Sequence, residues 1–368
     1  MKKKILPICV ILLVTYLFVW PVSLRPVAWQ PSKPVESVQV RPLNPVQRLG
    51  DGVLKGPEAL TFTSTGEMIT GLADGRVVSV SSDFRSCKVL GQVDGRPLGV
   101  ALDGEGRALV ADAQNGVVQL QGGTELRTLV HDADGIPVKF ADDLTIDGQG
   151  RVYLTDVSWK YGFDEQMLDV LEHGAHGRLI RYQPEDDLSV TMLAELNFAN
   201  GVTLGPDETY ILINETTAYR VTRFWLKGDK AGQREIFSDN LPGFPDNISF
   251  NGQDRFWVAL FAPRSAILDA IAPYPLLRRM IVRLPSFLHP KASDVAQIVA
   301  LDMNGAVVEH YRDLDGNGFG PITSVVERGG YLYFGSLAED AVGRVSLSAL
   351  RGGSQVSPTS ISMQDCQH

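Results

Sequence analysis

The 368-residue sequence predicts an all-β fold, a β-propeller of about six blades with a short helical insertion and an N-terminal transmembrane helix. Short apolar or β-branched runs alternate with Gly, Asp or Asn turns from residue 53 onward, which is typical of strands. Units of this kind recur about every 40–50 residues, the length of a propeller blade, and about six fit between residues 50 and 350. One segment among them has helical spacing, and a long apolar run precedes them all.

The N-terminal run predicts a membrane anchor over residues 1–24. Lys2, Lys3 and Lys4 precede an uncharged, mostly apolar stretch over residues 5–22. That stretch can cross about 30 Å of hydrocarbon at about 1.5 Å per residue. The lysines favour a cytoplasmic N-terminus. Because no small-residue cleavage site follows, an uncleaved signal anchor is preferred to a cleaved signal peptide. The body would then lie on the periplasmic or extracytoplasmic side of a single-pass protein.

The rest of the chain divides into three parts. Residues 25–46 are rich in proline and predict an extended spacer. The propeller is expected over residues 47–355 and a C-terminal tail over 356–368. Strand signals follow one another through the propeller, with EMITGLADGRVVSV at 67–80, RALVADAQNGVVQL at 107–120, YILINETTAYRVTRFWL at 210–226 and YLYFGSLAEDAVGRVSL at 331–347.

The helical insertion is expected over residues 265–288, where Pro273, Pro275 and Pro285 interrupt an apolar pattern of helical period. It comes after the second strand of a blade. A long insertion in a compact fold is often a lid or binding loop. A helix merely packed on the propeller face is an equal alternative.

Composition excludes several classes of function. Net charge is -9, from 43 acidic and 34 basic residues, and no basic stripe follows the chain, so no nucleic-acid partner is expected. The sequence has no Gly-x-Ser-x-Gly elbow, P-loop or dinucleotide fingerprint in a supporting context. Cys87 and Cys366 could pair in an oxidising compartment, because a propeller brings its chain ends together, or could remain two separate thiols.

Long motifs give the sequence a family resemblance. The stretch over residues 177–232, with GVTLGPDETYILINETTAYRVTRFWLKG at its centre, closely resembles the strictosidine-synthase-like proteins, in particular those close to the adipocyte plasma-membrane-associated proteins. RPLGVALD at 96–103, KFADDLTID at 139–147 and LPGFPDNISF at 241–250 continue the match. The wider superfamily contains the paraoxonases and the senescence-marker gluconolactonases. These relatives imply a six-bladed propeller with a calcium ion in its channel.

The resemblance also implies a set of metal ligands. Glu58 follows a Gly-Pro turn, Asn200 lies in an Ala-Asn-Gly motif, and a Pro-Asp-Asn motif supplies Asp246 and Asn247. Asp142 stands where relatives more often carry Asn. Oxygen ligands of this kind suit one hard divalent cation, expected to be calcium. Each motif alone is also ordinary turn chemistry, but their order along the chain matches the family and favours the metal.

Asp142 would change the charge of the site. Three carboxylates attract a divalent cation more strongly than two, and without the ion their repulsion would make at least one of them hold a proton. Asp143 matches a ligand of a second, structural ion in paraoxonases. The other carboxylate of that ion would fall at Ala59, so one metal is expected rather than two.

The superfamily implies a metal-dependent hydrolase of lactones or aryl esters, in which the cation polarises the carbonyl and Asp246 activates water. Two departures limit this expectation. Leu98 replaces the channel histidine of paraoxonases, and Thr323 stands where strictosidine synthase has its catalytic glutamate. Glu327 is near in sequence but is expected on an outward turn in solvent. A non-catalytic binding propeller is therefore the alternative function, and amine–aldehyde condensation is less favoured.

Overall fold

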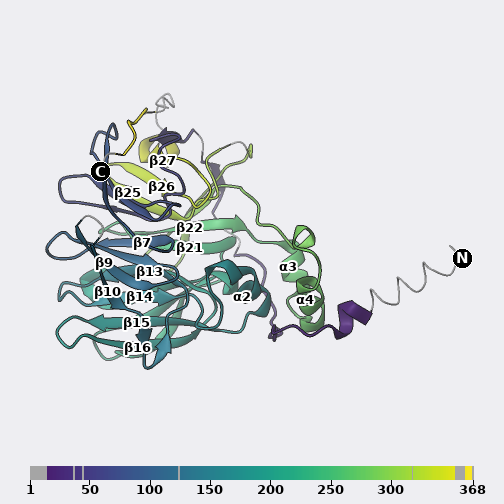
Figure 1. Cartoon of the computed structure of the whole chain (residues 1–368). Coiled ribbons are helices and arrows are strands. Elements are labelled where there is room, and N and C mark those ends of the chain that lie inside the picture. The colour runs from purple at the N-terminus through teal and green to yellow at the C-terminus, as the bar shows by residue number, and fades with distance from the viewer. Residues whose placement is uncertain are drawn as a thin grey trace, which may run out of the picture.

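The computed structural model describes residues 15–35, 38–43, 45–122, 125–316, 318–352 and 361–366. Six sheets of four or five strands are arranged around a central channel (Figure 1), which confirms the predicted six-bladed propeller. The first strands of successive blades pack side by side and line the channel.

The first three blades follow the order of the chain. They are β3 (Leu60–Phe62), β4 (Met68–Gly71), β5 (Arg76–Val80) and β6 (Cys87–Gln92), then β7 (Pro97–Leu102), β8 (Ala108–Asp112), β9 (Gly116–Gly122) and β10 (Glu125–Val130), then β13 (Ala141–Ile146), β14 (Val152–Asp156), β15 (Gly177–Gln183) and β16 (Leu188–Leu196). A short hairpin of β11 (Asp132–Ala133) and β12 (Ile136–Pro137) separates the second blade from the third.

The fourth blade contains β17 (Ala199–Leu204), β18 (Tyr210–Glu215), β19 (Arg220–Trp225) and β20 (Arg234–Ser238). The fifth contains β21 (Gly243–Phe250), β22 (Phe256–Pro263), β23 (Gln297–Leu301) and β24 (Val307–Arg312), with β1 (Val40–Pro42) added parallel to β24. The sixth combines β25 (Ser324–Arg328), β26 (Tyr331–Gly335) and β27 (Val342–Ser346) with β2 (Gln47–Leu49) from the start of the chain.

Aspartate turns form several of the hairpins that the sequence predicts. Asp103, Asp147 and Asp302 each accept two backbone N–H bonds through the same carboxylate oxygen, from the residues two and four positions later. This local bond closes the turn between two strands of one blade. Gly106, Gly150 and Gly305 each adopt the positive φ that such a turn needs.

Both chain ends close the ring of blades. β2 supplies the fourth strand of the last blade, and Ile361 forms a parallel bridge to Leu49 of β2. A disulfide joins Cys87 to Cys366, which decides between the two alternatives that the sequence leaves open. The bond links the C-terminal tail to the first blade across 279 residues of sequence.

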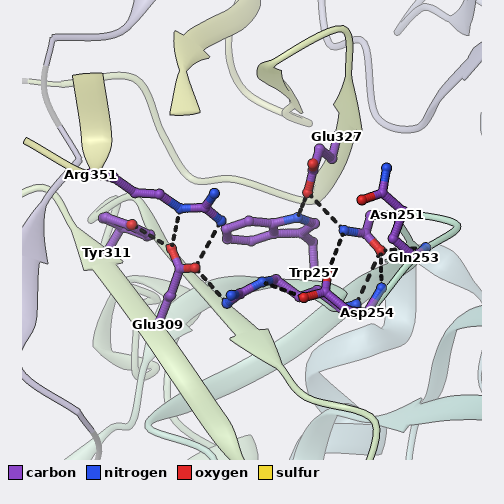
Figure 2. Close-up of polar contacts among 9 residues, drawn as sticks. Asn251, Gln253, Asp254, Trp257, Glu309, Tyr311, Glu327 and Arg351 are labelled. Carbon is purple, nitrogen blue, oxygen red and sulfur yellow. Dashed lines mark hydrogen bonds and ion pairs between the residues drawn. The ribbon is translucent and has the colours of Figure 1, made fainter. Parts of the chain in front are cut away.

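Apolar clusters fill the spaces between neighbouring blades, and Trp257 and Phe334 are fully buried in the cluster between the fifth and sixth blades. Polar contacts around Trp257 border this cluster (Figure 2). Glu327 accepts bonds from the Trp257 indole at 2.6 Å and from the Asn251 amide at 3.2 Å. The expectation that Glu327 is simply solvated is therefore wrong, because its carboxylate ties two blades together.

A second part of this network centres on Glu309 of β24 (Figure 2). Tyr311 donates to it at 2.5 Å, and Arg351, just after α5 (Leu347–Leu350), donates at 2.9 Å. Arg255 adds an ion pair to the same carboxylate at 2.5 Å. The network therefore joins the last helix of the chain to the fifth blade.

Helices gather at one end of the channel. They are η1 (Phe163–Glu165) and α2 (Gln166–Glu172) in the third blade, and α3 (Ala266–Ile271), α4 (Pro275–Val282) and η4 (Ser286–Leu288) after β22 (Figure 1). The second group is the helical insertion that the sequence predicts. The remaining short helices are η2 (Pro206–Glu208) and η3 (Thr216–Ala218).

The predicted signal anchor falls largely on residues 1–14, which lie outside the described residues. Residues 15–19 are helical. Within the part of the chain that the structure describes, no helix has the length and apolarity needed to span a membrane. The described residues of the proline-rich segment form no helix, and they pack along the propeller. Val27 donates to the Glu172 carbonyl at 2.9 Å, and Trp29 stacks on His173 at 4.1 Å between ring centres.

Candidate metal centre

A repeated backbone irregularity positions the candidate ligands. In four blades the first strand carries a bulge, in which two residues face a single residue of the second strand. The bulged pairs are Leu98–Gly99, Asp142–Asp143, Asn200–Gly201 and Asp246–Asn247. A bulge bends its strand and redirects a side chain. These four blades thus each present such a bulged pair in the first strand, which explains why three of the candidate ligands, far apart in sequence, line the same cavity.

Glycine fills the second bulge position where two blades approach closely. A Cβ on Gly99 would lie 2.7 Å from the Cα of Asp143, and one on Gly201 would lie 2.4 Å from the Cα of Asn247. These separations are too short for any side chain. The Leu-Gly and Asn-Gly pairs of the sequence therefore reflect the packing of each bulge on the next blade.

Four of the five predicted ligands line one cavity of about 660 Å³ at the helical end of the channel. They are Glu58, Asp142, Asn200 and Asp246, and each is no more than 6% exposed. The fifth, Asn247, lies on the lining of a different cavity, of about 330 Å³, bordered by later residues of the first strands. Asn247 still touches the first group, because its amide donates to Glu58 Oε1 at 2.6 Å.

Several buried oxygens in this group have no hydrogen-bond partner. They are Glu58 Oε2, Asp142 Oδ2, Asn200 Oδ1 and Asn247 Oδ1. A buried polar atom without a partner is costly. Carboxylate and amide oxygens are the donors that calcium takes in proteins, and a bound cation would satisfy them. The donor chemistry therefore fits the ion that the family resemblance implies.

The charged groups of the site lie too far apart to hold a cation by themselves. Among the described residues, no three carboxylate, imidazole or thiol groups lie close enough together to hold one metal ion. The amide oxygens of Asn200 and Asn247 would have to supplement the carboxylates. Chemistry and burial thus agree with a cation site, whereas the carboxylates are not drawn together.

Burial raises the pKa of every carboxyl in the group. Glu58 has its pKa raised to about 8, first by burial and then by the charge of Asp143, against a smaller opposing effect of Arg96. Burial and the nearby Glu58 raise the pKa of Asp142 and of Asp246 well above the usual range. A bond from Asn200 partly offsets the change at Asp246. Protonated carboxyls are therefore favoured without a cation, as the third carboxylate at Asp142 predicts.

Asp143 has a different role from Asp142. Its Oδ1 accepts from the Leu144 N–H at 2.9 Å, and its Oδ2 accepts from the Val202 N–H at 2.9 Å. Burial raises its pKa to about 7, although these two bonds oppose the change. The side chain joins the third blade to the fourth, so both of its oxygens are already occupied.

Five phenylalanines contribute to a cavity wall that is mainly apolar. Phe140, Phe163, Phe198, Phe244 and Phe261 surround the space above the four ligands. Met167 and Val170 of α2 also contribute. The spacing of Phe163, Met167 and Val170 is that of one helix face, a signal that the sequence analysis did not use.

The helical insertion borders the same cavity. Arg264, Ser265 and Leu268 at its start line the mouth, as do residues 290–293 just beyond its end. Leu268 also packs with apolar residues of α2 and α4. The insertion therefore packs against α2 and also lines the cavity.

Leu98 and Thr323, the two residues that differ from the catalytic residues of the relatives, are both buried. Leu98 is buried with Phe140 and Phe198 beside the cavity, where it adds apolar surface and no base. Thr323 is fully buried, donates to the Glu58 carbonyl at 3.1 Å and is not part of the cavity lining. No histidine is among the described lining residues of the cavity.

Comparisons with known proteins agree with this architecture. Residues 142–229 match the strictosidine synthase family, and residues 42–80 match the N-terminal region of strictosidine synthase-like proteins. Strictosidine synthase-like protein 6 of Arabidopsis thaliana is 32% identical over 84% of each chain. Human adipocyte plasma membrane-associated protein is 33% identical, over 84% of this chain and 79% of its own.

Solved structures share the fold at low sequence identity. A gluconolactonase of Xanthomonas campestris superposes with a TM-score of 0.59 at 15% identity, covering 89% of this chain and 99% of its own. Regucalcin of Agrobacterium tumefaciens, described as a calcium-binding protein, gives 0.56 at 13% identity, covering 84% and 95%. These likenesses concern the propeller. The sequence matches extend over more than four fifths of the chain, and they show that the protein belongs to the strictosidine synthase-like family.

Proposed function

We propose that this protein is a divalent-cation-dependent hydrolase, with calcium as the cation and a lactone or aryl ester as the substrate. One observation carries the proposal. Buried, unpartnered oxygens of Glu58, Asp142 and Asn200 lie at a cavity of about 660 Å³ whose walls are mainly apolar and include five phenylalanines. Apolar walls with a few convergent polar groups are typical of a site for a small molecule.

When bound, the cation would supply Lewis-acid polarisation of the substrate carbonyl. The chain itself would do the rest. The aromatic walls would bind the apolar part of the substrate and exclude bulk water. Asp246, which lies on the cavity lining next to Asn200, would accept the proton of the attacking water. Asn200 would hold Asp246 in place through the hydrogen bond between them.

The test is hydrolysis of a panel of lactones and aryl acetates by the full chain, with and without a chelator. Asp246→Asn keeps the shape of the side chain and removes its base. Asp254→Asn, on an outward turn with 65% of its side chain exposed, is the matched control. We expect chelation and Asp246→Asn to abolish turnover, and calcium to restore it only in the wild type and the control. Activity that survives both chelation and Asp246→Asn would contradict the proposal.

A non-catalytic binding propeller is the second candidate, because the carboxylates are not drawn together among the described residues. Calcium that raises the melting temperature without turnover of any panel member would favour it. Amine–aldehyde condensation is not proposed, since Thr323 is fully buried away from the cavity lining.

We also propose that residues 1–24 anchor the chain as a single-pass signal anchor with a cytoplasmic N-terminus. Lys2 to Lys4 and the apolar run support this orientation. The disulfide between Cys87 and Cys366 is expected in an oxidising, extracytoplasmic compartment. A relative is also named for its association with the plasma membrane. Resistance to alkaline extraction, with protease access to the propeller only from the extracytoplasmic side, is the expected result. Release of the chain at alkaline pH would contradict it.

A further inference from the structure

The helical insertion exposes large apolar side chains to the surface. Ile267, Tyr274, Leu276, Leu277, Phe287 and Leu288 are between 42% and 73% exposed, and together they define what we call the insertion face. Isolated exposed apolar residues are ordinary, but a contiguous group marks a surface that binds something. All six lie within a stretch of 22 residues over α3, α4 and η4.

The distribution of polar and apolar residues on α4 is the reverse of that expected for a helix facing water. Arg278 is only 2% exposed, while the neighbouring Leu276 and Leu277 are 48% and 42% exposed. The Arg278 guanidinium donates to the carbonyls of Leu171 at 3.1 Å and Ala272 at 2.9 Å, and also to that of Val27. A charged group thus lies inside, where its two terminal nitrogens donate to carbonyls and its Nε has no partner, while the two leucines are exposed.

The insertion is also tied to the end of the apolar N-terminal run. Arg283, which follows α4, donates to the carbonyl of Leu17 at 2.6 Å and to that of Trp20 at 2.7 Å. Leu17 lies within the helical residues 15–19, and Trp20 directly follows them. Leu24 packs with Tyr161 and Leu171 in a cluster to which Ile281 of α4 also belongs. These contacts hold α4 next to residues 17–24, at the end of the predicted anchor.

We propose that the insertion face rests on the lipid bilayer, partly buried in the headgroup region next to the anchor. The exposed Tyr16 and Trp20 at the end of the apolar run and Tyr274 on the insertion face are the residue types that gather at a membrane interface. Arg279 within α4 and Lys291 just after η4 add positive charge to this part of a chain of net charge -9, and such charges suit anionic headgroups. Because the insertion borders the cavity, this contact places the cavity mouth beside the membrane.

This inference rests on the proposed anchor and not on the proposed hydrolysis. Its test uses the full chain with Cys9→Ser, in which Cys87 and Cys366 are joined to each other. A nitroxide is attached at Leu276→Cys or at Phe287→Cys. The matched control is Leu188→Cys at the start of β16, where the native side chain is 52% exposed, close to the 48% of Leu276.

The labelled chain is placed in vesicles of phosphatidylcholine with a minor share of phosphatidylglycerol. Collision of each nitroxide with oxygen and with a water-borne nickel chelate is then measured. The labels at 276 and 287 should lie about 5–10 Å below the lipid phosphates, as for other helices at the interface. They should be shielded from nickel and open to oxygen, while the label at 188 should show the reverse.

Three results would overturn the inference, and they are distinguishable. Equal access of nickel to positions 276, 287 and 188 in a chain that floats with the vesicles would refute the lipid contact alone. A chain that does not float with the vesicles would refute the anchor and the lipid contact together. Dipolar coupling between labels on two chains at high lipid excess would show that a second copy covers the face. None of these readouts depends on calcium or on hydrolysis.

Discussion

The buried carboxyl group of Glu58 should make the cation-free protein lose stability as pH rises. Its pKa is about 8 in the folded chain, against 4.5 for an ordinary glutamate. Between these values the folded chain holds a proton that the unfolded chain has released. Unfolding free energy must then fall with rising pH, because stability decreases wherever the folded state binds more protons.

The size of the effect follows from the same pKa. Each proton that only the folded state retains lowers the unfolding free energy by about 1.4 kcal/mol per pH unit. His173 and His310 act in the opposite direction, since burial lowers their pKa values to about 3 and about 4. Because the unfolded histidines are half protonated at pH 6.5, each still adds roughly 0.4 kcal/mol of stability above that pH. Between pH 6.5 and pH 8, Glu58 alone should cost roughly 2 kcal/mol, with more from Asp142 and Asp246.

The assay is chemical unfolding of the chelated protein across that window, followed by fluorescence. Glu58→Gln removes the titration of this one carboxyl group. The variant should therefore be more stable than the wild type at pH 8 without a cation, and calcium should add little to its stability. Glu105→Gln, with 71% of its side chain exposed, is the matched control and should follow the wild type. A chelated wild type whose stability is flat or rises from pH 6.5 to pH 8, with Glu58→Gln unchanged, would refute the reasoning.

Three further predictions concern single parts of the structure. Replacing Cys87 and Cys366 together by Ser should lower the unfolding free energy by roughly 2–5 kcal/mol in denaturant titrations, and an unchanged midpoint would mean that the bond contributes nothing. Arg178→Met leaves the fully buried Asp156 without its ion pair at 2.6 Å, so the unfolding free energy should fall by about 3–5 kcal/mol. A smaller fall than that caused by an Arg→Met substitution at an exposed position would contradict this. Phe261→Ala opens the cavity wall and should reduce kcat/KM for aryl esters about 10- to 100-fold while sparing small lactones. Equal loss for both substrates would show that Phe261 does not contact the aryl group.

The propeller was predictable because its signals are local. Strand runs and aspartate turns such as those at Asp103 and Asp147 can be read within a few residues of sequence. The closing strand β2 could not be found in this way. It has only three residues, Gln47–Leu49, and its pairing with β27 depends on a partner almost 300 residues away. A strand this short has no periodicity of its own.

The candidate site was only partly predictable. Glu58, Asp142, Asn200 and Asp246 do line one cavity, as the family resemblance implies. Asn247 does not share that lining, because the second residue of a bulge leaves the strand in a different direction from the first. Bulge geometry arises from pairing with the neighbouring strand, so a motif such as Pro-Asp-Asn does not reveal it.

The packing of the proline-rich segment could not be predicted from composition. Its prolines disfavour a helix. They do not show whether the segment stands away from the propeller or packs on it. The contacts of Val27 and Trp29 depend on Glu172 and His173, which are more than 140 residues away. The buried position of Arg278 depends on the same assembly, because its acceptors come from three separate segments.

The central claim is that Glu58, Asp142, Asn200 and Asp246 bind a divalent cation, and titration calorimetry tests it most directly. Calcium added to the chelated full chain should bind at one site per chain. Binding should be lost in both Glu58→Gln and Asn200→Ala, and retained in Glu105→Gln. Absence of binding to the wild type, or equal binding to the wild type and Glu58→Gln, would contradict the claim.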